Sequence, residues 1–118
     1  MNLLAMSSVF GFLGVALGAF GAHGLQGRLT AEGLGWWETA TFYLLVHAVA
    51  GLSIGLQDRV GHSAGWLMIL GAGLFASTLF AMALGAPRML GAITPVGGLL
   101  MLGGWATLAL AAVRLSKL

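Results

Sequence analysis

The chain opens with the run MNLLAMSSVFGFLGVALGAFGAHGLQG, residues 1–27, in which no side chain is charged. About 20 residues of helix cross the hydrocarbon layer of a bilayer, so this run is long enough for one crossing and too short for two. A secretory signal carries positive charge ahead of its apolar core, and this run has none. We therefore expect a retained first helix over residues 3–22, with Gly24 as its C-terminal cap.

The remaining charges divide the rest of the chain in the same way. Three further uncharged runs cover residues 39–57, 60–87 and 89–113, and each has at least 19 residues. We expect one membrane span in each, over residues 37–56, 64–84 and 95–113. The last span starts most simply at Thr94-Pro95, where the threonine can cap the helix and proline fits its first turn. A kinked helix from Met89 is the alternative.

Composition points to the same class. Of 118 residues, 59% are hydrophobic and only 7% are charged, against about 25% charged in a soluble domain. Disorder would need low hydrophobicity, whereas the mean hydropathy here is +1.01. The sequence therefore predicts an all-α integral membrane protein, with residues 1–118 forming a single compact bundle of four transmembrane helices.

Charge and cysteine content exclude several functions. A net charge of +2 from five basic and three acidic residues provides no patch for nucleic acid. The absence of cysteine excludes disulfides, thiolate metal sites and dithiol chemistry. Three basic residues, Arg59, Arg114 and Lys117, lie on the side of both termini, against Arg28 and Arg88 on the other. This bias favours cytoplasmic termini.

The longest connection, residues 23–36, predicts a short interfacial segment between the first two helices. Thr30 can cap a brief helix there, and the pair Trp36-Trp37 is typical of the membrane interface. We expect that segment to be followed by a bend into the second span.

Small residues recur along single helix faces. In the first helix they include Gly11, Gly14 and Gly18, and in the fourth Gly97 and Gly104. In lipid, no hydrophobic force drives helices together, so they associate where small residues permit close approach. We interpret these five glycines as helix-packing positions.

His47 is the one ionisable residue deep inside an expected span, and such residues are functional candidates. Tyr43 lies one turn earlier on the same helix face. One hypothesis is that the pair binds a polar head group, relays a proton or helps to hold a metal. The other is a neutral histidine, hydrogen-bonded to a backbone carbonyl or a hydroxyl on another helix.

Further polar residues gather at one membrane surface, because the first and third connections lie on the same side. They are His23, Arg28, Glu32, Glu38, Arg88 and Thr94. One hypothesis is a polar pocket in which Glu38 pairs with Arg88, Arg28 or His23. The other is ordinary solvated loop residues. Glu38 is about 180° from His47 around the helix, so the two cannot share a site on a straight helix.

Three blocks of sequence resemble a known family. They are Gly18–Leu25, then Trp37-Glu38-Thr39-Ala40 with Tyr43 and His47, and then Leu90–Gly98. They resemble the small membrane-protein family called domain of unknown function 423, to which eukaryotic transmembrane protein 256 is similar. The resemblance covers essentially the whole chain. It implies a four-helix bacterial inner-membrane protein without an established activity, and its motif positions fall on Gly21, His23, Gly24, Glu38, Tyr43, His47, Thr94, Pro95 and Gly97.

These features favour a non-enzymatic membrane protein that serves a membrane assembly or the bilayer itself. The alternative is a binder or carrier of a small amphipathic molecule, such as a lipid or quinone. In that case His47 and Tyr43 supply the inner contact, and the mouth is formed by Glu38, His23, Arg88 and Thr94. An ion or proton pathway is a third, less supported hypothesis. We expect no catalytic set, metal or cofactor. The expected partners are membrane lipids, with a homo-oligomer or a larger membrane complex left open.

Overall fold

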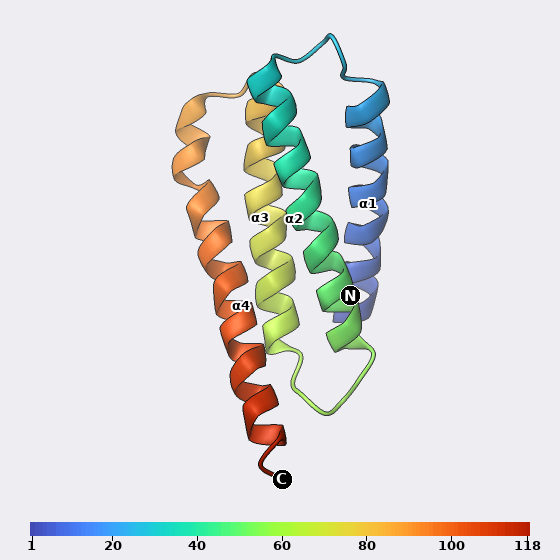
Figure 1. Ribbon diagram of the computed structural model, residues 1–118, viewed down its shortest axis with the longest axis vertical. Helices are drawn as coiled ribbons and strands as arrows, with labels where there is room; N and C mark the ends of the chain where they lie inside the picture. Colours follow the sequence, from blue (N-terminus) through green and yellow to red (C-terminus); the bar gives the residue numbers. More distant parts are fainter.

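The computed structural model describes residues 1–118 and consists of helices alone. In chain order these are α1 (Leu3–His23), α2 (Ala31–Gly55), α3 (Ser63–Ala83), the short 3-10 helix η1 (Arg88–Ala92) and α4 (Thr94–Leu115). The long helices alternate in direction, and both termini lie at the same end of the molecule (Figure 1). The particle measures 54 × 26 × 23 Å, so its long axis follows the helices. The prediction of an all-α chain is confirmed.

Local chemistry explains both ends of α1 and the start of α2. The Asn2 side chain accepts a hydrogen bond from the Ala5 N–H and caps α1. Thr30 does the same for α2, accepting from the Gly33 N–H at 3.0 Å. Gly24 is the C-cap of α1, and its N–H donates to the Phe20 carbonyl. It keeps right-handed backbone angles. The left-handed conformation that favours glycine occurs instead at Gly27, in the same connection.

The prediction of a separate interfacial segment before the second helix is wrong. Helix α2 runs without a break from Ala31 to Gly55, so residues 31–36 are its first turns. Trp37 accordingly does not face the lipid: only 4% of it is exposed. Its indole N–H donates to the Leu17 carbonyl of α1 at 2.7 Å. The tryptophan is buried because α2 already lies against α1 at this level.

Three helical segments are long and apolar enough to span a membrane. They are Leu3–His23, Ser63–Ala83 and Arg88–Leu115, the last combining η1 with α4. Helix α2 has 25 residues, which is sufficient length. Its polar side chains, including Glu38 and His47, lower its hydropathy. The structure therefore establishes four helices, of which three are clear candidate spans.

The helices pack in series and do not form a closed four-helix bundle. Helix α1 packs on α2, α2 on α3, and α3 on α4, with a lighter contact between α1 and α3. The backbones of α2 and α4 make no such contact, although both pack on α3. In Figure 1, α4 lies at the outer edge beside α3. An open seam therefore separates α2 from α4.

Glycines determine how closely α4 approaches α3. A Cβ atom on Gly97 would lie 2.6 Å from the backbone nitrogen of Phe75 and 2.7 Å from the Gly71 carbonyl oxygen. A Cβ atom on Gly104 would lie 2.8 Å from the Ala64 carbonyl oxygen. Backbone atoms cannot rotate out of the way as a flexible side chain can. These two positions therefore hold the helix backbones in direct contact.

The glycines of α1 face side chains of α2. A Cβ atom would come within 2.6 Å of Leu45 at Gly14 and within 2.9 Å of Thr41 at Gly18. At Gly11 the nearest atom, the Ala48 Cβ, is 3.9 Å away, an ordinary contact distance. Of these three glycines, Gly14 and Gly18 therefore lie where a larger residue would clash with α2, and Gly11 does not.

Ser7 provides a first prediction. Its hydroxyl is buried between α1 and α2 beside Gly51, and it has no hydrogen-bond partner. A buried, unsatisfied polar group costs about 1–3 kcal/mol. We expect Ser7→Ala to raise the free energy of unfolding by about 1 kcal/mol, measured by thermal unfolding in detergent. The matched control is Ser8→Ala, because the exposed Ser8 hydroxyl donates to the Leu4 carbonyl. A loss of stability in the first variant would contradict the prediction.

Candidate functional site

His47 is buried, and both of its ring nitrogens are engaged. Only 4% of the residue is exposed. Its Nδ1 lies 2.7 Å from the Tyr43 carbonyl oxygen, one turn earlier on α2. Its Nε2 accepts a hydrogen bond of 3.0 Å from the indole N–H of Trp105 on α4. This bond bridges the open seam between the two helices.

The Trp105 contact assigns the tautomer of His47. An indole nitrogen can only donate a hydrogen bond, so Nε2 is the acceptor. Nδ1 therefore carries the proton and donates a hydrogen bond to the Tyr43 carbonyl oxygen. The ring is therefore neutral in this arrangement. The sequence hypothesis is a neutral histidine bonded to a carbonyl or hydroxyl of another helix. The observed partners are instead a carbonyl of its own helix and an indole of α4. Neither nitrogen is left with a free lone pair for a metal ion or a proton relay.

Sequence reasoning missed Trp105. One signal was available, because a tryptophan within a span needs an acceptor for its indole N–H, and His47 offers one at mid-span. The two residues are 58 positions apart. Nothing in the sequence pattern shows that α4 faces α2 at this level, so only the fold pairs them.

The groove between α2 and α4, which we call the α2–α4 groove, has a volume of about 580 Å³. Phe75 of α3 forms part of its lining, and its ring centroid lies 4.8 Å from that of Tyr43. Tyr43 is 37% exposed, and its hydroxyl has no hydrogen-bond partner within the protein. The lining residues are Tyr43, His47, Phe75, Pro95, Gly98, Leu99, Met101, Leu102 and Trp105.

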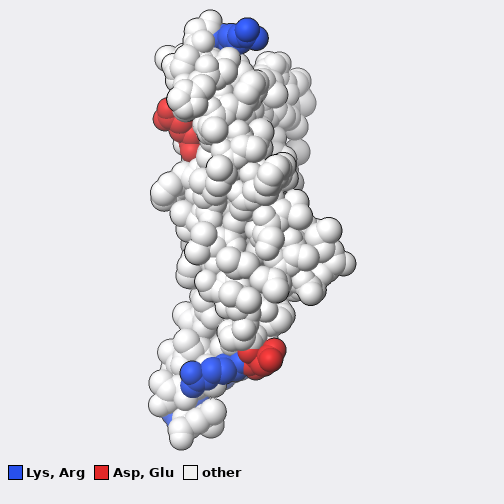
Figure 2. Space-filling model, turned by 90° about the vertical axis from the view of Figure 1, so that its right-hand side faces the viewer, with Lys and Arg blue, Asp and Glu red and all other residues white.

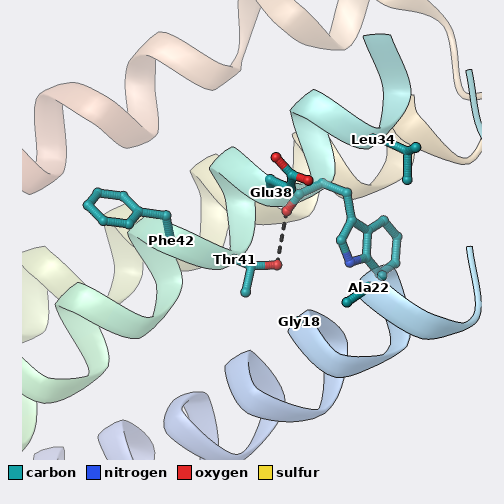
Figure 3. A pocket seen from close by; sticks show the side chains of 8 residues that line it. Gly18, Ala22, Leu34, Glu38, Thr41 and Phe42 are labelled. Atoms are coloured by element: carbon teal, nitrogen blue, oxygen red, sulfur yellow. Dashed lines mark hydrogen bonds between the residues drawn. The ribbon is translucent and has the colours of Figure 1, made fainter. Parts of the chain in front are cut away.

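Glu38 lies in a different groove, between α1 and α2. This groove has a volume of about 260 Å³. Figure 3 shows it lined by Gly18 and Ala22 of α1 facing α2, where the Thr41 hydroxyl donates to the Trp37 carbonyl at 2.9 Å. Glu38 is exposed at its edge and has no ion-pair partner. Its separation from His47 agrees with their opposite positions around the helix.

The ion pair at this end of the molecule involves Glu32. The Arg88 guanidinium binds the Glu32 carboxylate and lies 5.4 Å above the Trp36 ring centroid. The expected pairing of Arg88 with Glu38 is therefore wrong. Glu32 and Trp36 are one turn apart on the face of α2 toward η1, whereas Glu38 lies on the face toward α1. Charged side chains gather toward the two ends of the face in Figure 2, and the long middle is uncharged.

Arg28 and Arg88 line one cavity, which we call the polar-end cavity. Its volume is about 530 Å³, and it lies between the first connection, the start of α2 and the end of α3. Arg28 has no ion-pair partner. The remaining lining residues include the polar Glu32, the aromatic Trp36 and the apolar Met82 and Leu84. This cavity therefore combines positive charge with an apolar wall.

The other sequence candidates lie apart from these cavities. Thr94 starts α4. The sequence predicts that its hydroxyl caps the helix, but the hydroxyl instead lies 2.7 Å from the Thr78 hydroxyl of α3. Met89 belongs to the 3-10 helix η1, which directly precedes α4, and the α-helix itself starts at Thr94. His23 is exposed at the end of α1. No three histidine or acidic side chains come together in a metal-binding group.

Fold and site together define a small helical membrane protein whose open seam exposes an aromatic, largely apolar groove. The chain belongs to the family described as Protein of unknown function (DUF423), whose model matches residues 17–98. Arg28, Tyr43, His47 and Arg88 all fall inside the matched region, and Trp105 falls outside it.

Curated relatives cover nearly the whole chain. A UPF0382 membrane protein of Staphylococcus epidermidis is 38% identical over 115 residues, which are 94% of each chain. The UPF0382 inner membrane protein YgdD of Escherichia coli is 38% identical over 120 residues, 98% of this chain and 92% of its own. A UPF0382 membrane protein of Staphylococcus haemolyticus is 42% identical over 97 residues, covering 79% of this chain and 80% of its own. No solved structure matches the chain.

Proposed function

We propose that this is a four-span protein of the bacterial inner membrane with cytoplasmic termini. Helix α2 packs between α1 and α3, both of which are apolar enough to span, and runs antiparallel to each (Figure 1). A helix in that position crosses the same layer as its neighbours. Arg59, Arg114 and Lys117 belong to the end that carries the termini, which the positive-inside rule assigns to the cytoplasm.

Its function, in this proposal, is to hold the apolar chain of an amphipathic membrane molecule in the α2–α4 groove, without catalysis. The observation that carries the proposal is the groove itself. It has about 580 Å³ of space at mid-span, an aromatic and aliphatic lining, and one polar group without a protein partner, the Tyr43 hydroxyl. Ligand pockets commonly have this character, with a mostly apolar lining and few placed polar groups.

His47 and Trp105 serve this groove by shaping it. Their hydrogen bond joins α2 to α4 where the backbones do not touch. Because each satisfies the other, neither presents an unpaired polar atom to an apolar chain. The Tyr43 hydroxyl is then the group that meets a carbonyl or hydroxyl of the bound molecule.

Filling the groove tests the proposal. Gly98 lines it, and a Cβ atom there would meet nothing within 4 Å. We expect Gly98→Leu to fold normally and to lose most of its co-purifying amphiphile, measured by mass spectrometry of organic extracts. Gly103→Leu is the matched control, since Gly103 is equally unobstructed and does not line the groove. Equal amphiphile content in both variants and the parent protein would overturn the proposal.

Tyr43→Phe separates the polar contribution from the apolar one. Removing the hydroxyl should lower the retained amount by several-fold and leave the identity of the apolar chain unchanged, because one hydrogen bond contributes about 1 kcal/mol. A groove that instead receives a helix of another protein copy would yield an oligomer in gentle detergent. That oligomer would dissociate in Gly98→Leu and carry no amphiphile, which also contradicts the proposal.

A further inference from the structure

The two cavities on this side of the molecule lie along one line. Trp36 of the polar-end cavity and Tyr43 of the α2–α4 groove are seven residues apart on α2. Phe75 of the groove and Met82 of the polar-end cavity are also seven residues apart, on α3. Seven residues are two helical turns and about 10 Å, so each pair shares one helix face. The cavities are therefore stacked along the seam between α2 and α3.

Their chemistry changes along this line from charged to apolar. At the upper end are Arg28, Arg88 and Glu32, which together have a net charge of +1. Lower on the same line, the groove contains no charged side chain. Trp36 to His47 spans 11 residues, or about 16 Å, which is close to half the roughly 30 Å hydrocarbon thickness. A charged cavity above an apolar groove of this length has the polarity profile of one lipid leaflet.

The two arginines retain donors for an anion. Arg88 uses one nitrogen, Nη2, to bind Glu32, and 76% of its side chain is exposed. A guanidinium has five N–H donors, so several remain free. Arg28 has no ion-pair partner at all. The Trp36 ring beneath Arg88 holds the guanidinium in place.

We propose that the polar-end cavity binds the phosphate of an anionic phospholipid through Arg28 and Arg88, while an acyl chain of the same lipid lies in the α2–α4 groove. This inference rests on the proposed function and gives its ligand a chemical class. The excess positive charge favours a lipid with net negative charge, such as phosphatidylglycerol, over a zwitterionic one. Glu32 orients Arg88 and opposes the phosphate.

The proposal predicts opposite changes in lipid affinity for the arginine variants and for a variant of Glu32. Phosphatidylglycerol is titrated onto the delipidated full-length protein, and each complex is counted by native mass spectrometry. Arg28→Gln and Arg88→Gln should each weaken binding by about tenfold, the loss of one charge-assisted contact. Glu32→Gln should tighten binding, because it removes the opposing charge. Arg59→Gln, which makes the same charge change at the opposite end of the molecule, should leave binding unchanged.

Further measurements distinguish a lipid phosphate from free phosphate, and failure of the headgroup site from failure of the groove. Inorganic phosphate should not compete at millimolar concentration, since it has no chain for the groove; effective competition would show a free-anion site and overturn the lipid assignment. Loss of binding in Gly98→Leu with none in the arginine variants would overturn the headgroup site and retain the groove. Loss in the arginine variants alone would retain the headgroup site and overturn the groove. Equal binding of phosphatidylglycerol and phosphatidylethanolamine would overturn the charge preference.

Discussion

Replacing Gly97 with leucine is expected to separate α4 from α3. The first added carbon would already lie 2.6 Å from the Phe75 backbone nitrogen and 2.7 Å from the Gly71 carbonyl oxygen. Overpacking a well-packed core costs about 1–3 kcal/mol, and occasionally more. Here the obstructing atoms are helix backbone, so only movement of the whole helix relieves the clash. We expect a loss of at least about 3 kcal/mol, because α3 is the only long helix whose backbone lies close to that of α4.

The measurement for this prediction is thermal unfolding in mild detergent. Gly103→Leu is the control, since the same side chain on the same helix meets open space there. Gly97→Ala should lie between the two. A second readout is the intrinsic fluorescence of Trp105, whose indole loses its bond to His47 when α4 moves away. An unfolding temperature for Gly97→Leu equal to that of Gly103→Leu would show that the backbone contact is not required.

Trp37→Ala should produce the second large loss of stability. The side chain is 96% buried, donates to the Leu17 carbonyl of α1 and packs on Phe80 of α3 with ring centroids 4.5 Å apart. It therefore joins three helices. Truncating a buried tryptophan costs about 3–5 kcal/mol. We expect a loss near the lower limit, because lipid or detergent chains can enter part of the cavity.

Two variants define the origin of that loss. Trp37→Phe keeps most of the ring but removes the indole N–H, so it should cost about 1 kcal/mol. Trp36→Ala removes a neighbouring tryptophan that is only partly buried, and should cost clearly less than Trp37→Ala. If both alanine variants unfold at the same temperature, Trp37 behaves as the interfacial residue that its sequence position suggests, and its role in joining the helices is refuted.

The sequence by itself determined that the chain is helical and where each long helix lies, except that α2 begins at Ala31, before the expected residue 37. An apolar run of about 20 residues in lipid must satisfy its backbone hydrogen bonds internally, and a single helix does so. That rule needs no information about neighbours. The caps at Thr30 and Gly24 are likewise local, because each depends on atoms within four residues. The same local logic singled out His47 as a polar residue within an apolar segment.

Only the tertiary structure decided which residues meet. Arg88 binds Glu32, 56 positions away, and not Glu38, because Glu32 occupies the face of α2 toward η1. Trp37 is buried because α1 and α3 cover its face of α2, although its sequence suits the membrane interface equally well. His47 finds Trp105 because α2 and α4 both pack on α3. In lipid the apolar surface of one helix differs little from that of another, so hydropathy places helices in the membrane, and close packing at particular glycines selects their neighbours.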